Sequence, residues 1–209
     1  MTETATLKPR TRRPAIPEHE MIRYISQFMP LSEAEAREIV KIMKVRSFKK
    51  GTVLLREGQV TKLCYFVLKG CIRQYFLVDG EEKTTNFYTE AESLNPLCVV
   101  TKKPSEYYVA CVEDSILLVG NSDMESAIFE KFPRFETLCR ILSDEWLAKN
   151  KAEFDAFKTS TPEKRYLDLL ENRPDLLQRA PHYQLASYLG ITPQSLSRLR
   201  SRIAKTGTG

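Results

Sequence analysis

The residues best suited to chemistry lie near the end of the chain, where hydrogen-bonding and cationic side chains recur at helical spacing. Gln194, Ser197, Arg198, Ser201 and Arg202 would share the outward side of one helix. Gln can pair with adenine and Arg with guanine in the major groove of DNA, while Ser and Arg also contact phosphates. From residue 182 to the end, the chain has four basic residues and no Asp or Glu. The segment therefore predicts a surface that binds nucleic acid.

Two helices joined by a tight turn must position these side chains. Ala186 is small enough to let a second helix cross closely over the first. Gly190 permits the left-handed backbone with which the first helix can end, and Thr192 with Pro193 is typical of a new helix start. The apolar sides of the two helices would be formed by Leu185, Leu189, Leu196, Leu199 and Ile203. This pattern predicts a helix-turn-helix, which places its second helix in the major groove.

Within this unit we expect Gln194 and Arg198 to contact bases. The further candidates for contacts with bases or backbone are Thr192, Ser195, Ser197, Arg200, Ser201, Arg202 and Lys205. The alternative is a terminal helical hairpin with a solvated basic face, which charge alone would favour. The joint occurrence of Ala186, Gly190 and the helix start at Thr192 favours a helix that reads DNA.

Composition limits what the rest of the chain can be. The chain has 209 residues, 42% of them hydrophobic, which suffices for one large or two modest domains. Its net charge of +5 is concentrated at the two ends, because the leader up to Arg13 is also basic. No run of about 18 apolar residues occurs that could span a membrane. We expect a cytoplasmic protein without a membrane partner, and a disordered basic leader over residues 1–17.

Cysteine and histidine usage argues against a metal site or an enzyme. The five cysteines are scattered and lack C-x-x-C spacing; they are Cys64, Cys71, Cys98, Cys111 and Cys139. We expect small buried hydrophobic residues, with a redox-sensing thiol as the alternative. A metal-dependent enzyme of the cupin type would need several histidines on barrel strands, whereas His19 and His182 both lie outside the strand region. We therefore expect no cofactor and no catalytic residues.

The chain divides into three regions with different patterns of apolar residues. Residues 21–44 have a helical pattern, and residues 46–119 have β-branched and aromatic runs separated by turn residues. The expected strands are 52–55, 64–68, 71–78, 83–88, 106–112 and 115–119. Helical patterns return after Ser122. The predicted fold class is α+β, with an N-terminal antiparallel β-roll of jelly-roll or cupin-like type over 18–131. A long dimerisation helix over 132–158 and a C-terminal helix-turn-helix domain over 159–209 follow it.

The long helix carries an apolar stripe that includes Phe135, Leu138, Leu142 and Trp146. At about 25 residues it would span roughly 37 Å, too far for a small barrel alone to cover. We therefore expect these four residues to form a homodimer interface. The alternative is that the stripe packs only on the barrel of its own chain.

The order of β-barrel, long helix and helix-turn-helix resembles the Crp-Fnr superfamily of bacterial transcription regulators. The resemblance rests on residues 50–58 (KGTVLLREG), 65–70 (YFVLKG) and 186–198 (ASYLGITPQSLSR). It implies a dimeric, sequence-specific regulator of transcription that binds a near-palindromic operator in double-stranded DNA, with RNA polymerase as a further partner. It also implies base contacts by Gln194 and Arg198, which match the family's base-reading positions.

The chain departs from this family in two ways. Members that bind cyclic nucleotides use a Gly-Glu pair and an Arg, but residues 90–109 contain no Gly, and no Arg occurs between Arg73 and Arg134. Lys102 and Lys103 would be weaker phosphate ligands than a bidentate Arg, so we expect no response to cyclic AMP. The sequence does not identify an effector. The alternative is a β-roll that binds no effector and serves only as a dimerisation scaffold.

The second departure is at the end of the chain. The residues after Ile203 leave no room for the usual β-hairpin wing, so we expect phosphate contacts from the leader or from Arg200 and Arg202. The alternative function is that of a ligand-binding or protein-interaction β-roll whose basic terminal helices do not read DNA specifically.

Overall fold

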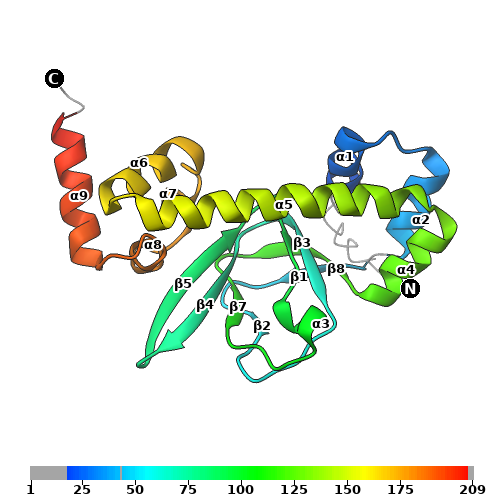
Figure 1. The fold of residues 1–209 in the computed structure, drawn as a ribbon, viewed down its shortest axis with the longest axis horizontal. Helices are drawn as coiled ribbons and strands as arrows, with labels where there is room; N and C mark the ends of the chain where they lie inside the picture. The colour runs from blue at the N-terminus through cyan, green and yellow to red at the C-terminus, as the bar shows by residue number, and fades with distance from the viewer. Residues whose placement is uncertain (1–17, 43, 207–209) are drawn as a thin grey trace, which may run out of the picture.

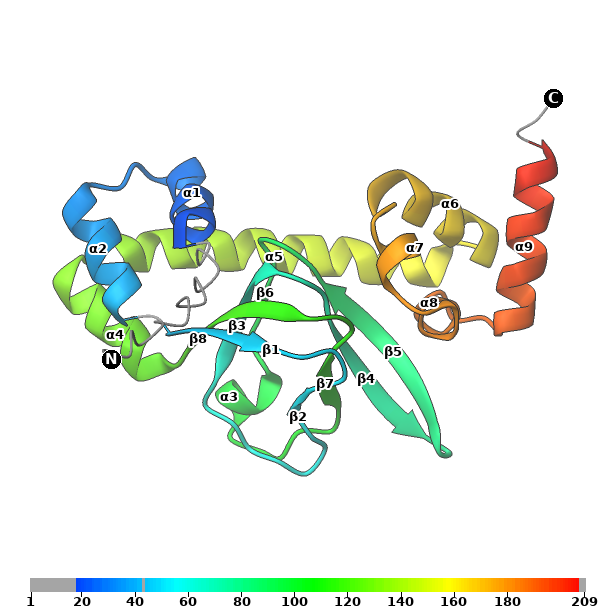
Figure 2. The same ribbon diagram turned by 180° about the vertical axis from the view of Figure 1, so that it is seen from behind.

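A computed structural model describes residues 18–42 and 44–206, which form a β-roll crossed by one long helix (Figures 1 and 2). The expected leader over residues 1–17 lies outside the described residues. The helices around the roll are α1 (Glu18–Phe28), α2 (Glu33–Ile42), α4 (Ser122–Lys131) and α5 (Arg134–Thr159). The terminal helices are α6 (Pro162–Asn172), α7 (Leu176–Arg179), α8 (His182–Tyr188) and α9 (Pro193–Thr206).

The roll consists of two four-stranded antiparallel sheets, with strand orders β1-β8-β3-β6 and β2-β7-β4-β5. The strands are β1 (Lys44–Phe48), β2 (Val53–Leu55), β3 (Cys64–Lys69), β4 (Ile72–Val78), β5 (Glu81–Tyr88), β6 (Ser93–Leu94), β7 (Tyr108–Cys111) and β8 (Ser115–Gly120). A short helix, α3 (Leu97–Thr101), connects β6 to β7. The expected α+β class and antiparallel β-roll are confirmed.

The six expected strands are all present, with ends that differ slightly, but β1 and β6 were not predicted. β6 has only two residues, which is too short to show a pattern. β1 reads Lys-Val-Arg-Ser-Phe and is mostly exposed, so its sequence lacks a clear apolar face. Both strands exist because they pair with their neighbours, β1 with β8 and β6 with β3.

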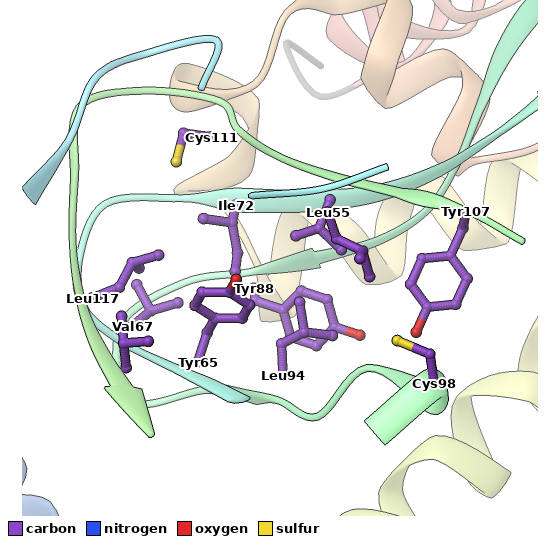
Figure 3. Close-up of a cluster of buried hydrophobic side chains, with 12 residues drawn as sticks. Leu55, Tyr65, Val67, Ile72, Tyr88, Leu94, Cys98, Tyr107, Cys111 and Leu117 are labelled. Carbon is purple, nitrogen blue, oxygen red and sulfur yellow. The ribbon is translucent and has the colours of Figure 1, made fainter. Parts of the chain in front are cut away.

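A first core fills the interior of the roll (Figure 3). Leu55, Ile72, Val109 and Leu117 are at most 1% exposed, and they project inward from different strands. The rings of Tyr65, Tyr88 and Tyr107 and the thiols of Cys98 and Cys111 complete this cluster. The interior of the roll is therefore packed with the chain's own side chains.

A second core lies outside the roll, where α1, α2, α4 and the start of α5 pack on strands β3 and β8. Phe135 and Leu138 of α5 are 4% and 5% exposed and belong to this core. They contact a cluster contributed by α2, β3, β8 and α4, namely Ile39, Leu68, Leu118 and Ile128. The prediction that Phe135 and Leu138 form a dimer interface is therefore wrong, because the monomer itself buries both side chains.

The remaining two residues of the predicted interface differ from this pair. Leu142 is partly buried against the same core, whereas Trp146 is 47% exposed. α5 runs from Arg134 to Thr159, close to the predicted 132–158, and extends well beyond the roll toward the terminal helices (Figure 1). The exposed apolar surface of α5 therefore begins beyond its first turns.

A third core joins the roll to the terminal helices. Cys71, Phe87 and Val112 of the roll pack with a cluster on α6–α9 that includes Leu176, Leu185, Ala186, Leu189 and Leu196. Both groups are almost completely buried. Within the part of the chain that the structure describes, no helix is long and apolar enough to cross a membrane.

Candidate nucleic-acid interface

Helices α8 and α9 are joined by the tight turn expected from the sequence. Gly190 has φ of +70°, in the left-handed region that glycine tolerates best. At the start of α9, the Ser195 amide donates to Oγ1 of Thr192 at 3.2 Å, so Thr192 caps the helix as predicted. The Ile191 amide donates to the Ala186 carbonyl at 3.0 Å and closes the end of α8.

The two helices pack closely through small and apolar side chains. Ala186 is fully buried, and Leu196 and Leu199 of α9 are 1% and 7% exposed. A Cβ atom at position 190 would lie 3.1 Å from Cζ of Phe157, at the end of α5. Gly190 is therefore favoured by its own backbone conformation, and a larger residue would also require the Phe157 ring to shift.

The outer face of α9 carries the predicted contact residues. Thr192, Gln194, Ser195, Ser197, Arg198, Arg200, Ser201 and Arg202 are all exposed, while the side chain of Lys205 is outside those that the structure describes. Ser197, Arg198, Ser201 and Arg202 line a shallow depression. Arg202 also donates to Oε2 of Glu163 on α6 at 2.5 Å. These residues all lie on α9 or at its start, and α9 is at one end of the molecule (Figure 2).

Helix α6 packs against this pair of helices. Tyr166 and Leu169 are each 5% exposed in the third core, and Leu170 packs against it. Leu167 is 43% exposed and does not belong to this core. It lies on the other side of a helix whose inner face is already formed by its neighbours.

One arginine that sequence reasoning missed connects three chain segments. Nε of Arg165 donates to the carbonyl of Leu189 at 3.0 Å, and Nη1 donates to the carbonyls of Ser160 at 2.7 Å and Phe157 at 3.2 Å. Its guanidinium also lies 4.4 Å from the centroid of the Phe157 ring. Arg165 therefore ties the end of α5 to the turn before α9.

Helix α8 also contacts the roll directly. Ser187 Oγ accepts from the Thr84 amide at 2.8 Å and donates to the Glu82 carbonyl at 3.2 Å. The ring of Tyr188 meets that of Phe87 edge-on, with centroids 5.3 Å apart. No local pattern marks these contacts, since Ser187 and Thr84 are far apart in the sequence.

Two further arginines reach from the terminal helices to acidic turns of the roll. Arg173 donates to Thr89 Oγ1 at 2.9 Å and to Glu92 Oε2 at 3.1 Å. Arg179 forms ion pairs with Glu90 at 2.7 Å and with Glu113 at 2.5 Å. Burial opposes ionisation of Glu90, yet its hydrogen bonds from Arg179 and from the Gly70 amide lower its pKa.

The interior of the roll is filled by aromatic and apolar side chains of the chain itself. The hydroxyl of Tyr107 accepts from the Leu97 amide at the start of α3, at 2.8 Å, and Figure 3 shows that hydroxyl pointing toward α3. Burial raises the pKa of Tyr65 to about 12, which marks an apolar surrounding. Among the described residues, the buried charged side chains are Glu35, which lies on α2, and Arg73 of β4. Arg73 is held elsewhere, by Thr84 Oγ1 at 3.1 Å and by Glu82.

Three of the five thiols have the environment of core residues, while Cys64 and Cys139 are partly buried. Cys71, Cys98 and Cys111 are buried, and burial raises the pKa of Cys71 to about 12 and that of Cys111 to about 11. A reactive cysteine needs a lowered pKa and exposure, so these sites favour the structural interpretation over redox sensing. Among residues 18–42 and 44–206, no group of His, Cys, Asp and Glu side chains could hold a metal ion.

Comparison with known proteins gives two kinds of likeness. Residues 45–132 match the cyclic nucleotide-binding domain family. The catabolite activator protein of Thermus thermophilus is 20% identical, with a TM-score of 0.52 over 86% of this chain and 87% of that one. FixK2 of Bradyrhizobium japonicum is 17% identical, with a TM-score of 0.65 over 79% and 86%. No curated protein sequence matches this chain.

A mutant of CooA from Carboxydothermus hydrogenoformans is 16% identical, with a TM-score of 0.63 over 89% of this chain and 85% of that one. These likenesses extend over most of each protein. At this level of identity they show a shared fold.

Proposed function

We propose that this Crp-Fnr-like chain, with its cyclic nucleotide-binding domain at residues 45–132, is a sequence-specific DNA-binding regulator of transcription. The observation that carries the proposal is the outer face of α9. It presents Gln194, Ser197 and Arg198 to solvent, contains no acidic side chain, and is held by the capped turn at Gly190 and Thr192. Such a helix–turn–helix can enter the major groove.

The test of this proposal is base discrimination. The operator is first selected from random double-stranded DNA, and binding is then measured for Gln194→Ala and Arg198→Ala. Each substitution should cost about 1–3 kcal/mol at the operator and relax the preference at one base pair. Arg200→Ala is the matched control, since loss of a phosphate contact weakens binding to all sequences about equally. Unchanged discrimination by both variants would instead favour a β-roll module that does not read DNA.

We further propose a homodimer joined along the middle and end of α5. Trp146 is 47% exposed, Leu147 63% and Phe154 58%, an apolar surface that water would otherwise contact. Because Phe135 and Leu138 are buried in the monomer, the proposed interface lies closer to the terminal helices than the sequence predicted. A dimer along this surface would place two copies of α9 on successive half-sites, about 34 Å apart on a near-palindromic operator.

Light scattering tests the dimer. Leu147→Glu should convert it to a monomer at tens of micromolar protein, because an unpaired carboxylate would be buried in the interface. Ala148→Glu introduces the same group about 100° around the helix and should leave the dimer intact. A wild-type protein that is monomeric at that concentration would contradict this part of the proposal.

We propose that the roll does not respond to cyclic AMP. The packed tyrosines, the hydrogen bond from the Leu97 amide to Tyr107, and the engagement of the buried Arg73 by Thr84 and Glu82 support this. Cyclic AMP at 100 times a typical dissociation constant would stabilise a binding protein by about 2.7 kcal/mol, so thermal melts with and without millimolar nucleotide are sensitive. A rise in melting temperature would contradict the proposal. We also propose RNA polymerase as a further partner.

A further inference from the structure

Strand β5 is at the edge of its sheet, and the terminal helices cover part of that edge. The sheet order β2-β7-β4-β5 leaves one side of β5 without a neighbouring strand. There the Thr84 amide donates to Ser187 Oγ at 2.8 Å, and the same hydroxyl donates to the Glu82 carbonyl at 3.2 Å. One serine of α8 thus satisfies a backbone donor and an acceptor that an exposed edge would present to water.

Ion pairs also hold the terminal helices to turns of the roll. Arg179 bridges Glu90 and Glu113, which lie on two different turns of the roll, and its side chain is only 20% exposed. Arg173 adds Thr89 and Glu92 on the first of these turns. Ion pairs that are shielded from water and made by the planar guanidinium group define orientation better than exposed ones. We call the contacts of Ser187, Arg173 and Arg179 with the roll the dock.

Apolar packing underlies the dock. Cys71 is fully buried, Phe87 is 1% exposed, and Leu176 and Leu185 from the terminal helices are 0% and 1% exposed. Close-packed apolar contacts have few alternative arrangements, so the terminal helices cannot slide on the roll without opening a cavity.

The dock leaves the outer face of α9 free of the roll. Gln194 and Arg198 are exposed in the docked arrangement, and α9 lies at the end of the molecule away from α1 and α2 (Figure 1). A contact that inhibited DNA binding by masking α9 would cover this face or engage its side chains. The dock does neither to Gln194 and Arg198.

We propose that the dock sets the orientation of α9 relative to the roll and α5, so that DNA binding needs no effector. This inference rests on the proposed DNA-binding function. In a dimer, the two copies of α9 must fit two half-sites together, and a protein that samples the competent orientation only part of the time binds more weakly by that fraction. The dock keeps that fraction close to one.

The decisive variant is Glu90→Gln with Glu113→Gln. It removes two negative charges, so electrostatic attraction alone predicts tighter DNA binding, whereas loss of orientation predicts weaker binding. If the released helices are competent one time in ten, the apparent dissociation constant rises about tenfold for each subunit. The matched control is Glu33→Gln with Glu130→Gln on α2 and α4, where both carboxylates are exposed. Dock-variant affinity equal to or tighter than that of the control would overturn the proposal.

A second measurement does not depend on DNA. Ser187→Ala removes only the two hydrogen bonds to β5, and the Thr84 amide should then exchange with deuterium at least about tenfold faster, because it loses its acceptor. Equal exchange rates in the variant and the wild type would overturn the dock. If the wild type selects no operator while the Thr84 amide exchanges faster in Ser187→Ala than in the wild type, the proposed DNA-binding function is wrong, whereas the contacts of the dock are confirmed.

Discussion

Replacing Arg165 by Met tests whether one guanidinium fixes the junction between the long helix and the turn before α9. In the wild type, Arg165 donates to the carbonyls of Phe157, Ser160 and Leu189 at distances from 2.7 to 3.2 Å. Two of these carbonyls are at the end of α5, where the last turn of a helix lacks partners within the helix. Met has similar length and no donor, so the carbonyls would lose their partner.

The size of the effect follows from this geometry. A hydrogen bond to a charged donor is worth about 1.5–3 kcal/mol when buried, but Arg165 is half-buried and water can replace part of each bond. The contact with the Phe157 ring, at 4.4 Å, adds about 0.5–1 kcal/mol at such a site. We expect Arg165→Met to lower the free energy of unfolding by about 2–3 kcal/mol, after a partial offset from apolar packing of Met.

Urea unfolding followed by circular dichroism at 222 nm measures this change. Lys164→Met is the matched control, because it removes the same charge from the neighbouring exposed position and should change stability by less than about 0.5 kcal/mol. Arg165→Lys keeps the charge but not the planar fork, and should lose an intermediate amount. An unfolding free energy for Arg165→Met within about 0.5 kcal/mol of the control would refute this account of the junction.

Three other substitutions or reactions test separate features. Gly190→Ala should lower stability by about 1–2 kcal/mol in thermal melts, because Ala is strained at φ of +70°, and an unchanged melt would contradict that requirement. Hydrogen bonds from Lys131 and Lys41 lower the pKa of Glu38 to about 2 from its usual 4.5, so the stability that they provide is present above pH 4.5 and is lost as the pH falls toward 2. Glu38→Gln should therefore be less stable than the wild type at pH 7, and the difference should shrink as the pH falls through 2, as measured by urea unfolding across pH; a constant difference would contradict the pKa assignment. Because burial raises the pKa of Cys71 to about 12, a thiol reagent at pH 8 should modify it only after unfolding, and mass spectrometry would detect earlier labelling.

Much of the α8–α9 unit was predictable because its determinants are local. Gly190 and Thr192 act on their own backbone or on the next turn of helix, and Leu196 and Leu199 repeat at the helical period. Local rules of this kind need no knowledge of the rest of the fold. The exposure of Gln194 and Arg198 then follows from the burial of the opposite side of α9.

The interface residues on α5 were predicted less well for a physical reason. An apolar stripe shows which side of a helix avoids water but does not show what covers it. Phe135 and Leu138 are covered by α2, α4 and the outer surface of the roll, which meet only in the folded chain. Trp146 belongs to the same pattern in the sequence, yet it lies beyond that covered region.

Taken by itself, the sequence determined the α+β class, the six principal strands, the long helix and the side chains on the outer face of α9. These depend on period, turn residues and capping, all of which act over a few residues. Only the tertiary structure decided that tyrosines fill the roll, that Arg165 joins α5 to the turn at Gly190, and that Ser187, Arg173 and Arg179 dock the terminal helices on the roll. Such contacts join residues far apart in the chain, and side-chain type alone does not indicate which distant partner will be close.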